Sequence, residues 1–237
     1  LGLLAIGAML AAAGCAAVLY GIGHRAEDHS AYGEPLPAAP AEEDPLAHMG
    51  ADFLVDEGFT SHLPIVILDM GGAEPPITSQ YDVTEKRYVT LPEVDPYLTG
   101  RISVLDAEEG VNRLSDAPAS ESPMLIKRRG NGSMHYAKAQ WLVKLLTDSG
   151  EDNDLDLLGM GAEHEWILNG SMADRTMMRN YLSYSICSEV LPYTPDFKYC
   201  EVLLRQPDGS YSYQGVYLLG ENIKVGPDRV DLTEERE

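Results

Sequence analysis

The hydrophobic residues of the chain form one long uninterrupted run at its start. Residues 1–22 contain no charged side chain, and about 20 apolar residues are enough for a helix to cross the hydrocarbon core of a membrane. This pattern predicts a membrane helix or signal anchor over residues 1–22. The alternative is a cleaved signal peptide, because residues 11–15 approximate a lipoprotein cleavage site. The apolar run continues beyond Cys15, which favours the anchor.

A polar segment follows over residues 23–61. It carries nine acidic residues, one basic residue, Arg25, and four prolines. A segment of this composition buries too little apolar surface to offset the entropy lost on ordering. The pattern therefore predicts an acidic, proline-containing linker. The scarcity of positive charge after the apolar run favours an extracytoplasmic location for the domain that follows, tethered to the cell membrane by a single pass.

After the linker, the hydrophobic pattern changes to short runs that are typical of β-strands. We expect strands over residues 63–69, 100–106 and 123–130, each bounded by turn residues. A hairpin is predicted from residues 199–205 and 211–219, because the Pro-Asp-Gly sequence between them suits a tight turn.

One later segment has the apolar period of an amphipathic helix. Its apolar residues recur at a spacing of four, at Met178, Leu182, Ile186 and Val190, and Tyr181 and Cys187 widen the same face. We expect this face to pack into the core, with Asp174 capping the start of the helix and Pro192 ending it. The tryptophans and the tyrosines of the second hairpin strand are likewise expected in the core rather than stacked on a ligand. Strands and helix together predict an α+β domain.

Charge and cysteine content narrow the choice of partners. The chain has 17 basic and 38 acidic side chains and a formal net charge of −21. Such a surface repels polyanions, so nucleic acid and anionic membrane surfaces are excluded as partners. Outside the apolar run the cysteines are Cys187 and Cys200. They could form a disulfide in an extracytoplasmic domain, but two buried thiols are the favoured interpretation.

Several short patterns occur in one order along the chain: LPIVILD from Leu63, RRGNGSMHYAKAQWLVKL from Arg128, LLGMGAEHEWILNGSMADRTMMRNYLSYSI from Leu157, and YQGVYLLGENIKVGPDRVDL from Tyr213. In this order they resemble the CotH (spore coat protein H) kinase family over about residues 63–232. The matching positions are Arg129, Gly130, Asn131, Lys138, Lys144, Trp166, Asp174, Arg179, Asn180, Gly215, Val216, Tyr217 and Glu221. The resemblance implies an atypical protein-kinase fold that binds ATP with Mg²⁺ or Mn²⁺ and phosphorylates serine on extracytoplasmic or spore-coat proteins of bacteria.

Phosphoryl transfer needs basic groups on the phosphates and carboxylates on the metal. The predicted cofactor-binding residues are Arg129, Gly130, Asn131, Ser133, Lys138, Lys144 and Glu221. The first four form a glycine turn that could approach a nucleotide closely. Lys138 and Lys144 would share one face of an extended strand, and Glu221 would pair with one of them. The alternatives remain a hairpin turn with a left-handed Asn131, two solvated lysines and a solvated carboxylate.

No metal ligand or catalytic residue is assigned from the sequence. Residues 152–163 have the acidic spacing of a calcium loop, but Leu157 stands where such a loop needs glycine, so a solvated acidic loop is preferred. His164 lacks the second histidine of a zinc-protease helix. The resemblance places the catalytic aspartates beyond residue 237. We therefore expect residues 62–237 to be the N-terminal part of a CotH-like kinase domain, incomplete at its C-terminus and inactive alone. The alternative is a non-catalytic cell-surface structural or adhesion module.

Overall fold

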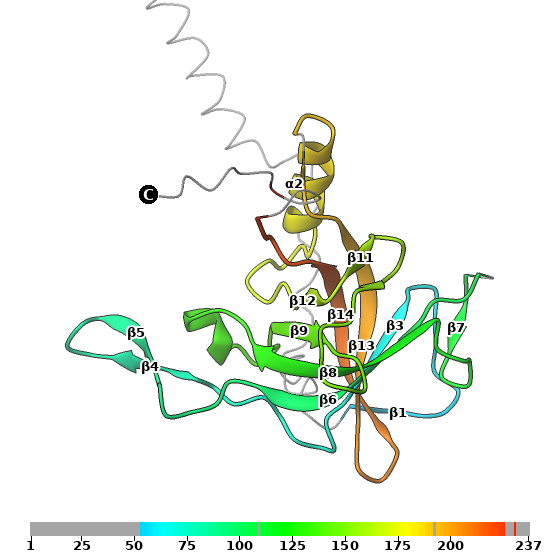
Figure 1. Cartoon of the computed structure of the whole chain (residues 1–237), viewed down its shortest axis with the longest axis horizontal. Helices are drawn as coiled ribbons and strands as arrows, with labels where there is room; N and C mark the ends of the chain where they lie inside the picture. The colour runs from blue at the N-terminus through cyan, green and yellow to red at the C-terminus, as the bar shows by residue number, and fades with distance from the viewer. Residues whose placement is uncertain (1–52, 109, 192, 226–229, 231–237) are drawn as a thin grey trace, which may run out of the picture. The chain divides into compact units, whose positions relative to one another are not determined.

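The computed structural model describes residues 53–108, 110–191, 193–225 and 230. Its centre is a closed sheet of seven strands, in which each strand pairs with two neighbours in the order β14-β12-β9-β8-β6-β3-β13 and β13 returns to β14 (Figure 1). The strands are β3 (Ile65–Asp69), β6 (Leu98–Leu105), β8 (Ser120–Arg128), β9 (Trp141–Leu145), β12 (Glu165–Asn169), β13 (Phe197–Arg205) and β14 (Tyr211–Glu221). Within this closed sheet the pairs are antiparallel except β3 with β13.

Alternation along these strands fills the interior of the barrel with side chains. On β9, Trp141, Val143 and Leu145 are 0–3% exposed, and on β12 Trp166 and Leu168 are fully buried. Successive residues of a strand point to opposite sides of a sheet, so every second residue enters the barrel. Because all seven strands supply apolar residues at these positions, the closed sheet encloses a packed hydrophobic core.

Among the described residues, short strand pairs and two helical segments lie outside the barrel sheet. β1 (Leu54–Val55) pairs with the start of β14. Three two-stranded sheets are formed by β2 (Thr60–Ser61) with β7 (Asn112–Arg113), β4 (Ser79–Asp82) with β5 (Arg87–Thr90), and β10 (Leu155–Asp156) with β11 (Ala162–Glu163). The helical segments are the 3-10 turn η2 (Gly132–His135) and the α-helix α2 (Arg179–Ser188). β1 and β2 thus lie within the segment predicted as linker.

The predicted strands are confirmed, whereas the predicted fold class is wrong. The expected strands and hairpin correspond to β3, β6, β8 and β13–β14. The protein is nevertheless mostly β, because the strands close into one barrel and the described residues contain α2 as their one α-helix. It is therefore not the α+β, kinase-like architecture that the sequence suggested.

The apolar face predicted for α2 is present, but it does not enter the core. Met178, Leu182, Ile186 and Val190 are 44–76% exposed, and no residue of α2 is buried. Asp174 lies five residues before the helix and accepts the backbone N–H of Arg179 at 2.9 Å through its carboxylate. It therefore serves the first turn of α2 without being the N-cap residue, which is Met178.

Both cysteines of the domain are free. Cys200 lies in the barrel core, fully buried, and burial raises the pKa of its thiol to about 12. Cys187 on α2 is half-buried. No disulfide joins them, so the preference for two thiols is confirmed, although only Cys200 is fully buried.

The predicted membrane helix over residues 1–22 lies outside the described residues. Within residues 53–225, as far as these are described, no helix has the length and apolar character required to cross a membrane. The membrane location predicted from the sequence thus finds no support in the structure, and we withdraw it.

Candidate functional site

Charged side chains gather on the outer face of the sheet where β9, β12 and the end of β14 lie side by side. Lys144 and Glu165 are opposite each other on β9 and β12, so their side chains share the face that points away from the barrel. Asn222, just after β14, donates to the Glu165 carboxylate at 2.9 Å. The neighbouring charged residues complete a group that we call the His164 cluster: Lys144, Asp152, Asp154, Glu163, His164, Glu165 and Lys224.

Glu163 is the most deeply buried carboxylate of the His164 cluster. It ends β11 and is 7% exposed. Its Oε1 accepts the backbone N–H groups of His164 at 2.8 Å and Glu165 at 3.2 Å, and the Lys224 ammonium lies 2.6 Å away. Burial raises the pKa of Glu163, but these donors outweigh burial and hold the pKa below its usual value. Glu163 is therefore ionised at neutral pH and fixes the turn between β11 and β12.

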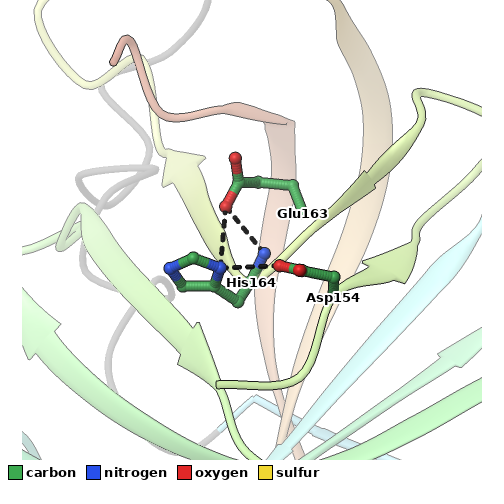
Figure 2. Close-up of side chains that lie close together, drawn as sticks. All are labelled: Asp154, Glu163 and His164. Atoms are coloured by element: carbon green, nitrogen blue, oxygen red, sulfur yellow. Dashed lines mark hydrogen bonds and ion pairs between the residues drawn. The ribbon is translucent and has the colours of Figure 1, made fainter. Parts of the chain in front are cut away.

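The imidazole of His164 faces carboxylates on both sides. Its Nδ1 lies 2.7 Å from Asp154 Oδ1 and 3.2 Å from Glu163 Oε1, as Figure 2 shows. Its Nε2 lies 3.4 Å from Asp152 Oδ2. The ligand atoms of Asp154, Glu163 and His164 all lie within 4.8 Å of one another, so one ion could contact the three side chains together.

Lysines already neutralise part of this negative charge. Lys144 Nζ is 2.7 Å from Asp152 Oδ1; this hydrogen bond lowers the pKa of Asp152 and raises that of Lys144. Lys224 pairs with Glu163 and approaches Glu165 at 3.6 Å. Two carboxylates and an imidazole form a donor set that suits Mn²⁺ better than Mg²⁺, which prefers oxygen ligands alone. A cation in this position would compete with Lys224 for Glu163.

The predicted glycine turn lies at the other end of β9. Arg129 donates its backbone N–H to Gln140 at 2.8 Å, and Asn131 precedes η2 with a φ of −114°. Gly130 has a φ of +104°, and a Cβ there would collide with Ser133. The left-handed position of this turn is therefore Gly130 and not Asn131.

Lys138, just before β9, lies near this turn. Its Nζ donates to the Val216 carbonyl at 2.5 Å and sits 4.6 Å from the centre of the Tyr217 ring. Burial lowers the pKa of Lys138. The bulge at Gly215, where φ is +90°, brings β14 close to this side chain: a Cβ on Gly215 would lie 3.5 Å from Lys138 Nζ.

Glu221 and Lys144 lie towards the opposite end of the barrel. Glu221 is 3% exposed and accepts hydrogen bonds from the Tyr193 hydroxyl at 3.3 Å and the Asp196 backbone at 3.1 Å. Glu221 is opposite Trp166, which is opposite Val143, so it shares the inner face, whereas Lys144 points outwards.

The glycine turn and Lys138 therefore lie at one end of β9, whereas Lys144 and Glu221 lie towards the other end of the barrel. The structure does not bring Lys138, Lys144 and Glu221 together. Their roles in nucleotide binding stay predictions. The sequence analysis considered Asp154 and Glu163 within a calcium loop and His164 against a zinc-protease helix, and it set both interpretations aside; neither motif contains all three residues. The one signal was an acidic loop close to a Glu-His-Glu sequence, and only the pairing of β10 with β11 folds that loop against His164.

Part of this chain matches the model of a known protein family. Residues 126–236 match the family model described as CotH kinase protein, and this match is consistent with a CotH family region in that part of the chain. The match begins near the end of β8 and takes in both the glycine turn and the whole His164 cluster. It leaves out residues 63–125, over which the sequence was also found to resemble the family. No curated protein matches the chain.

Proposed function

We propose that the CotH family region of this chain binds ATP with a divalent cation and serves the phosphorylation of serine on protein substrates. The observation that carries this proposal is the match of residues 126–236 to a family described as a kinase. In the reaction, the serine hydroxyl gives its proton to a general base and its oxygen bonds to the γ-phosphorus, while the bond from that phosphorus to the bridging oxygen breaks and ADP leaves.

The His164 cluster supports the proposal because it combines the two kinds of group that phosphoryl transfer needs. Asp154, Glu163 and His164 would hold Mn²⁺ or Mg²⁺, and the ion would neutralise charge on the triphosphate. The Lys144 side chain is 28% exposed. When the nucleotide binds, its ammonium leaves the Asp152 carboxylate and contacts a phosphate oxygen instead. The His164 backbone N–H and Glu165 N–H keep Glu163 ionised and in place as the nucleotide arrives.

Nucleotide binding is tested first, because it does not depend on knowing the acceptor protein. We expect ATP with Mn²⁺ to raise the melting temperature of the protein saturably, since a ligand that binds the folded state stabilises it. Lys144→Met should weaken ATP affinity about tenfold, the scale of one charge-assisted hydrogen bond. Lys127→Met is the matched control: this lysine lies on the adjacent strand β8, over the ring of Tyr97, and outside the cluster.

Transfer is measured next, as incorporation of the γ-phosphate of ATP into serine of an acceptor protein.

Glu163→Gln should reduce Mn²⁺ binding, detected for Mn²⁺ alone by electron paramagnetic resonance. If neither metal supports a nucleotide-dependent rise in melting temperature, or if Lys127→Met weakens ATP binding as much as Lys144→Met, the proposal fails.

One feature of the cluster favours a second candidate function, a non-catalytic structural module. Lys144 and Lys224 are each within 2.7 Å of a carboxylate, which is the arrangement of a structural ion-pair network. A protein that binds neither ATP nor Mn²⁺ at millimolar concentration would favour this candidate over the kinase.

A further inference from the structure

The same four residues, Asn-Gly-Ser-Met, occur twice in the chain, at residues 131–134 and 169–172. The first copy lies in the glycine turn and η2, and the second begins at the last residue of β12. In both copies the residue after asparagine is glycine, which has no Cβ to hinder an approach of its backbone nitrogen to the asparagine side chain. Two copies of one sequence allow the effect of the fold to be separated from the effect of the local sequence.

The reaction in question is the deamidation of asparagine. The backbone nitrogen of the next residue bonds to the side-chain Cγ, its proton passes to the departing amide nitrogen, and the bond from Cγ to that nitrogen breaks to release ammonia. Water then opens the five-membered succinimide ring at one of its two carbonyls, which leaves aspartate or isoaspartate. The ring closes most readily when the attacking nitrogen and Cβ lie on the same side of the Cα–C bond, so the ψ angle of the asparagine decides how well the two groups are positioned.

The backbone of Asn131 is close to the geometry that ring closure needs. Its φ is −114° and its ψ is −85°. Because Cβ stands about 120° from the backbone nitrogen around the Cα–C bond, this ψ places the Gly132 nitrogen within about 35° of eclipsing Cβ. Asn131 is exposed, and its side chain makes no capping hydrogen bond to η2. No such bond therefore holds its amide away from the Gly132 nitrogen.

A hydrogen bond from Ser79 favours the attack as well. The Asn131 carbonyl belongs to the same peptide bond as the Gly132 nitrogen, and it accepts the Ser79 hydroxyl at 3.2 Å. As the nitrogen loses its proton, negative charge develops on this carbonyl oxygen, and a donor already in place stabilises that charge.

At Asn169 the fold opposes the same reaction. Asn169 is paired with Leu218 in the ladder of β12 and β14, and the ψ of about +135° that is usual in antiparallel strands turns the next nitrogen about 105° away from Cβ. The Asn169 Oδ1 accepts the Ser171 backbone N–H at 2.9 Å. Gly170 is buried, and a Cβ there would lie 3.1 Å from the Tyr217 ring. Both the side chain and the following peptide are thus held in place.

We propose that Asn131 is a site of spontaneous deamidation in the folded protein and that the fold protects Asn169 from the same reaction. The product carries a new carboxylate in the glycine turn, two residues after Arg129. The reaction needs water alone, so the proposal is independent of the proposed function.

The test is peptide mapping by mass spectrometry after incubation of the folded protein at mildly alkaline pH, which favours loss of the amide proton. Asn131 should deamidate at least about tenfold faster than Asn169, because only Asn131 is positioned for ring closure. In urea the two asparagines should react at similar rates, since the tetrapeptide is the same. If Asn131 reacts no faster than Asn169 in the folded protein, or stays intact while the unfolded chain reacts, the proposal is overturned.

Two variants sharpen the test. Asn131→Gln should abolish the reaction at this position, because glutamine would have to close a larger and less favourable ring; Gly132→Ala is unsuitable, since its Cβ would strike the Tyr88 ring. Ser79→Ala should slow the deamidation of Asn131 about fivefold, the scale of one hydrogen bond. An unchanged slow rate at Asn169 in the Ser79→Ala protein shows that the barrel is intact.

Discussion

The barrel interior and the exposed face of α2 carry the same kind of apolar residue, but only the residues of the barrel interior are buried. Leu168 on β12 is fully buried between Trp141 and Leu219, its opposite residues on β9 and β14. Leu182 on α2 belongs to an equally regular apolar pattern and is 44% exposed. When a sheet closes into a barrel, the inward side chains of each strand are surrounded by those of the other strands. The apolar face of a helix is buried only if another element packs against it.

The attachment of α2 to the barrel is made by aromatic side chains. Tyr184 stacks on Phe197 with ring centres 4.6 Å apart, and Tyr181 contacts Tyr199 at 5.0 Å. The Tyr199 hydroxyl also donates to the Met177 carbonyl at 2.7 Å, just before the helix. Tyr181 belongs to the apolar face that was predicted to pack and Tyr184 does not, so the attachment of α2 follows the predicted face only in part.

The largest effect is expected from truncating the buried leucine. Leu168→Ala should lower the free energy of unfolding by about 2–5 kcal/mol, because it removes apolar contacts and leaves a cavity between two strands. Urea denaturation followed by far-ultraviolet circular dichroism measures this change. A loss below about 1 kcal/mol would mean that the barrel core is much looser than its burial indicates.

A smaller effect is expected where α2 meets the barrel. Gly220 on β14 is opposite Phe197, and a Cβ at Gly220 would collide with the Phe197 ring. Gly220→Ala should therefore cost about 1–3 kcal/mol through overpacking, and faster hydrogen exchange of the α2 amides should accompany the loss.

The Phe197 ring supplies the control for this prediction. In a Phe197→Ala background the same glycine substitution should cost little, since the ring that it strikes is gone. Additive costs of the two substitutions would show that Gly220 matters for backbone conformation rather than for the Phe197 ring.

The smallest effect is expected on the exposed face of α2. Leu182→Ala makes the same chemical change as Leu168→Ala, but it should alter the free energy of unfolding by about 0.5 kcal/mol or less, because the side chain has little contact to lose and alanine favours helix. The same urea experiment measures it. A cost comparable to that of Leu168→Ala would show that this face is covered in solution.

Local pattern predicted local structure well in this protein. The apolar runs that became β3, β6 and β8 and the turn between β13 and β14 follow from side-chain alternation and from the conformations of proline and glycine, which act over a few residues. The acidic loop and Glu163–Glu165 were visible as separate features. Their meeting at His164 was not, because it depends on the β10–β11 pairing and on Lys224, 60 positions along the chain from His164.

The sequence by itself determined which segments are strands, where the chain turns, that the surface is strongly acidic, and which residues resemble the CotH family. Only the tertiary structure decided that the strands close into a barrel, that Lys144 and Glu221 face opposite sides of the sheet, and that the apolar stripe of α2 stays outside. The physical reason is range: alternation and turn preference act between neighbouring residues, whereas closure and burial depend on which distant strand supplies the opposing surface.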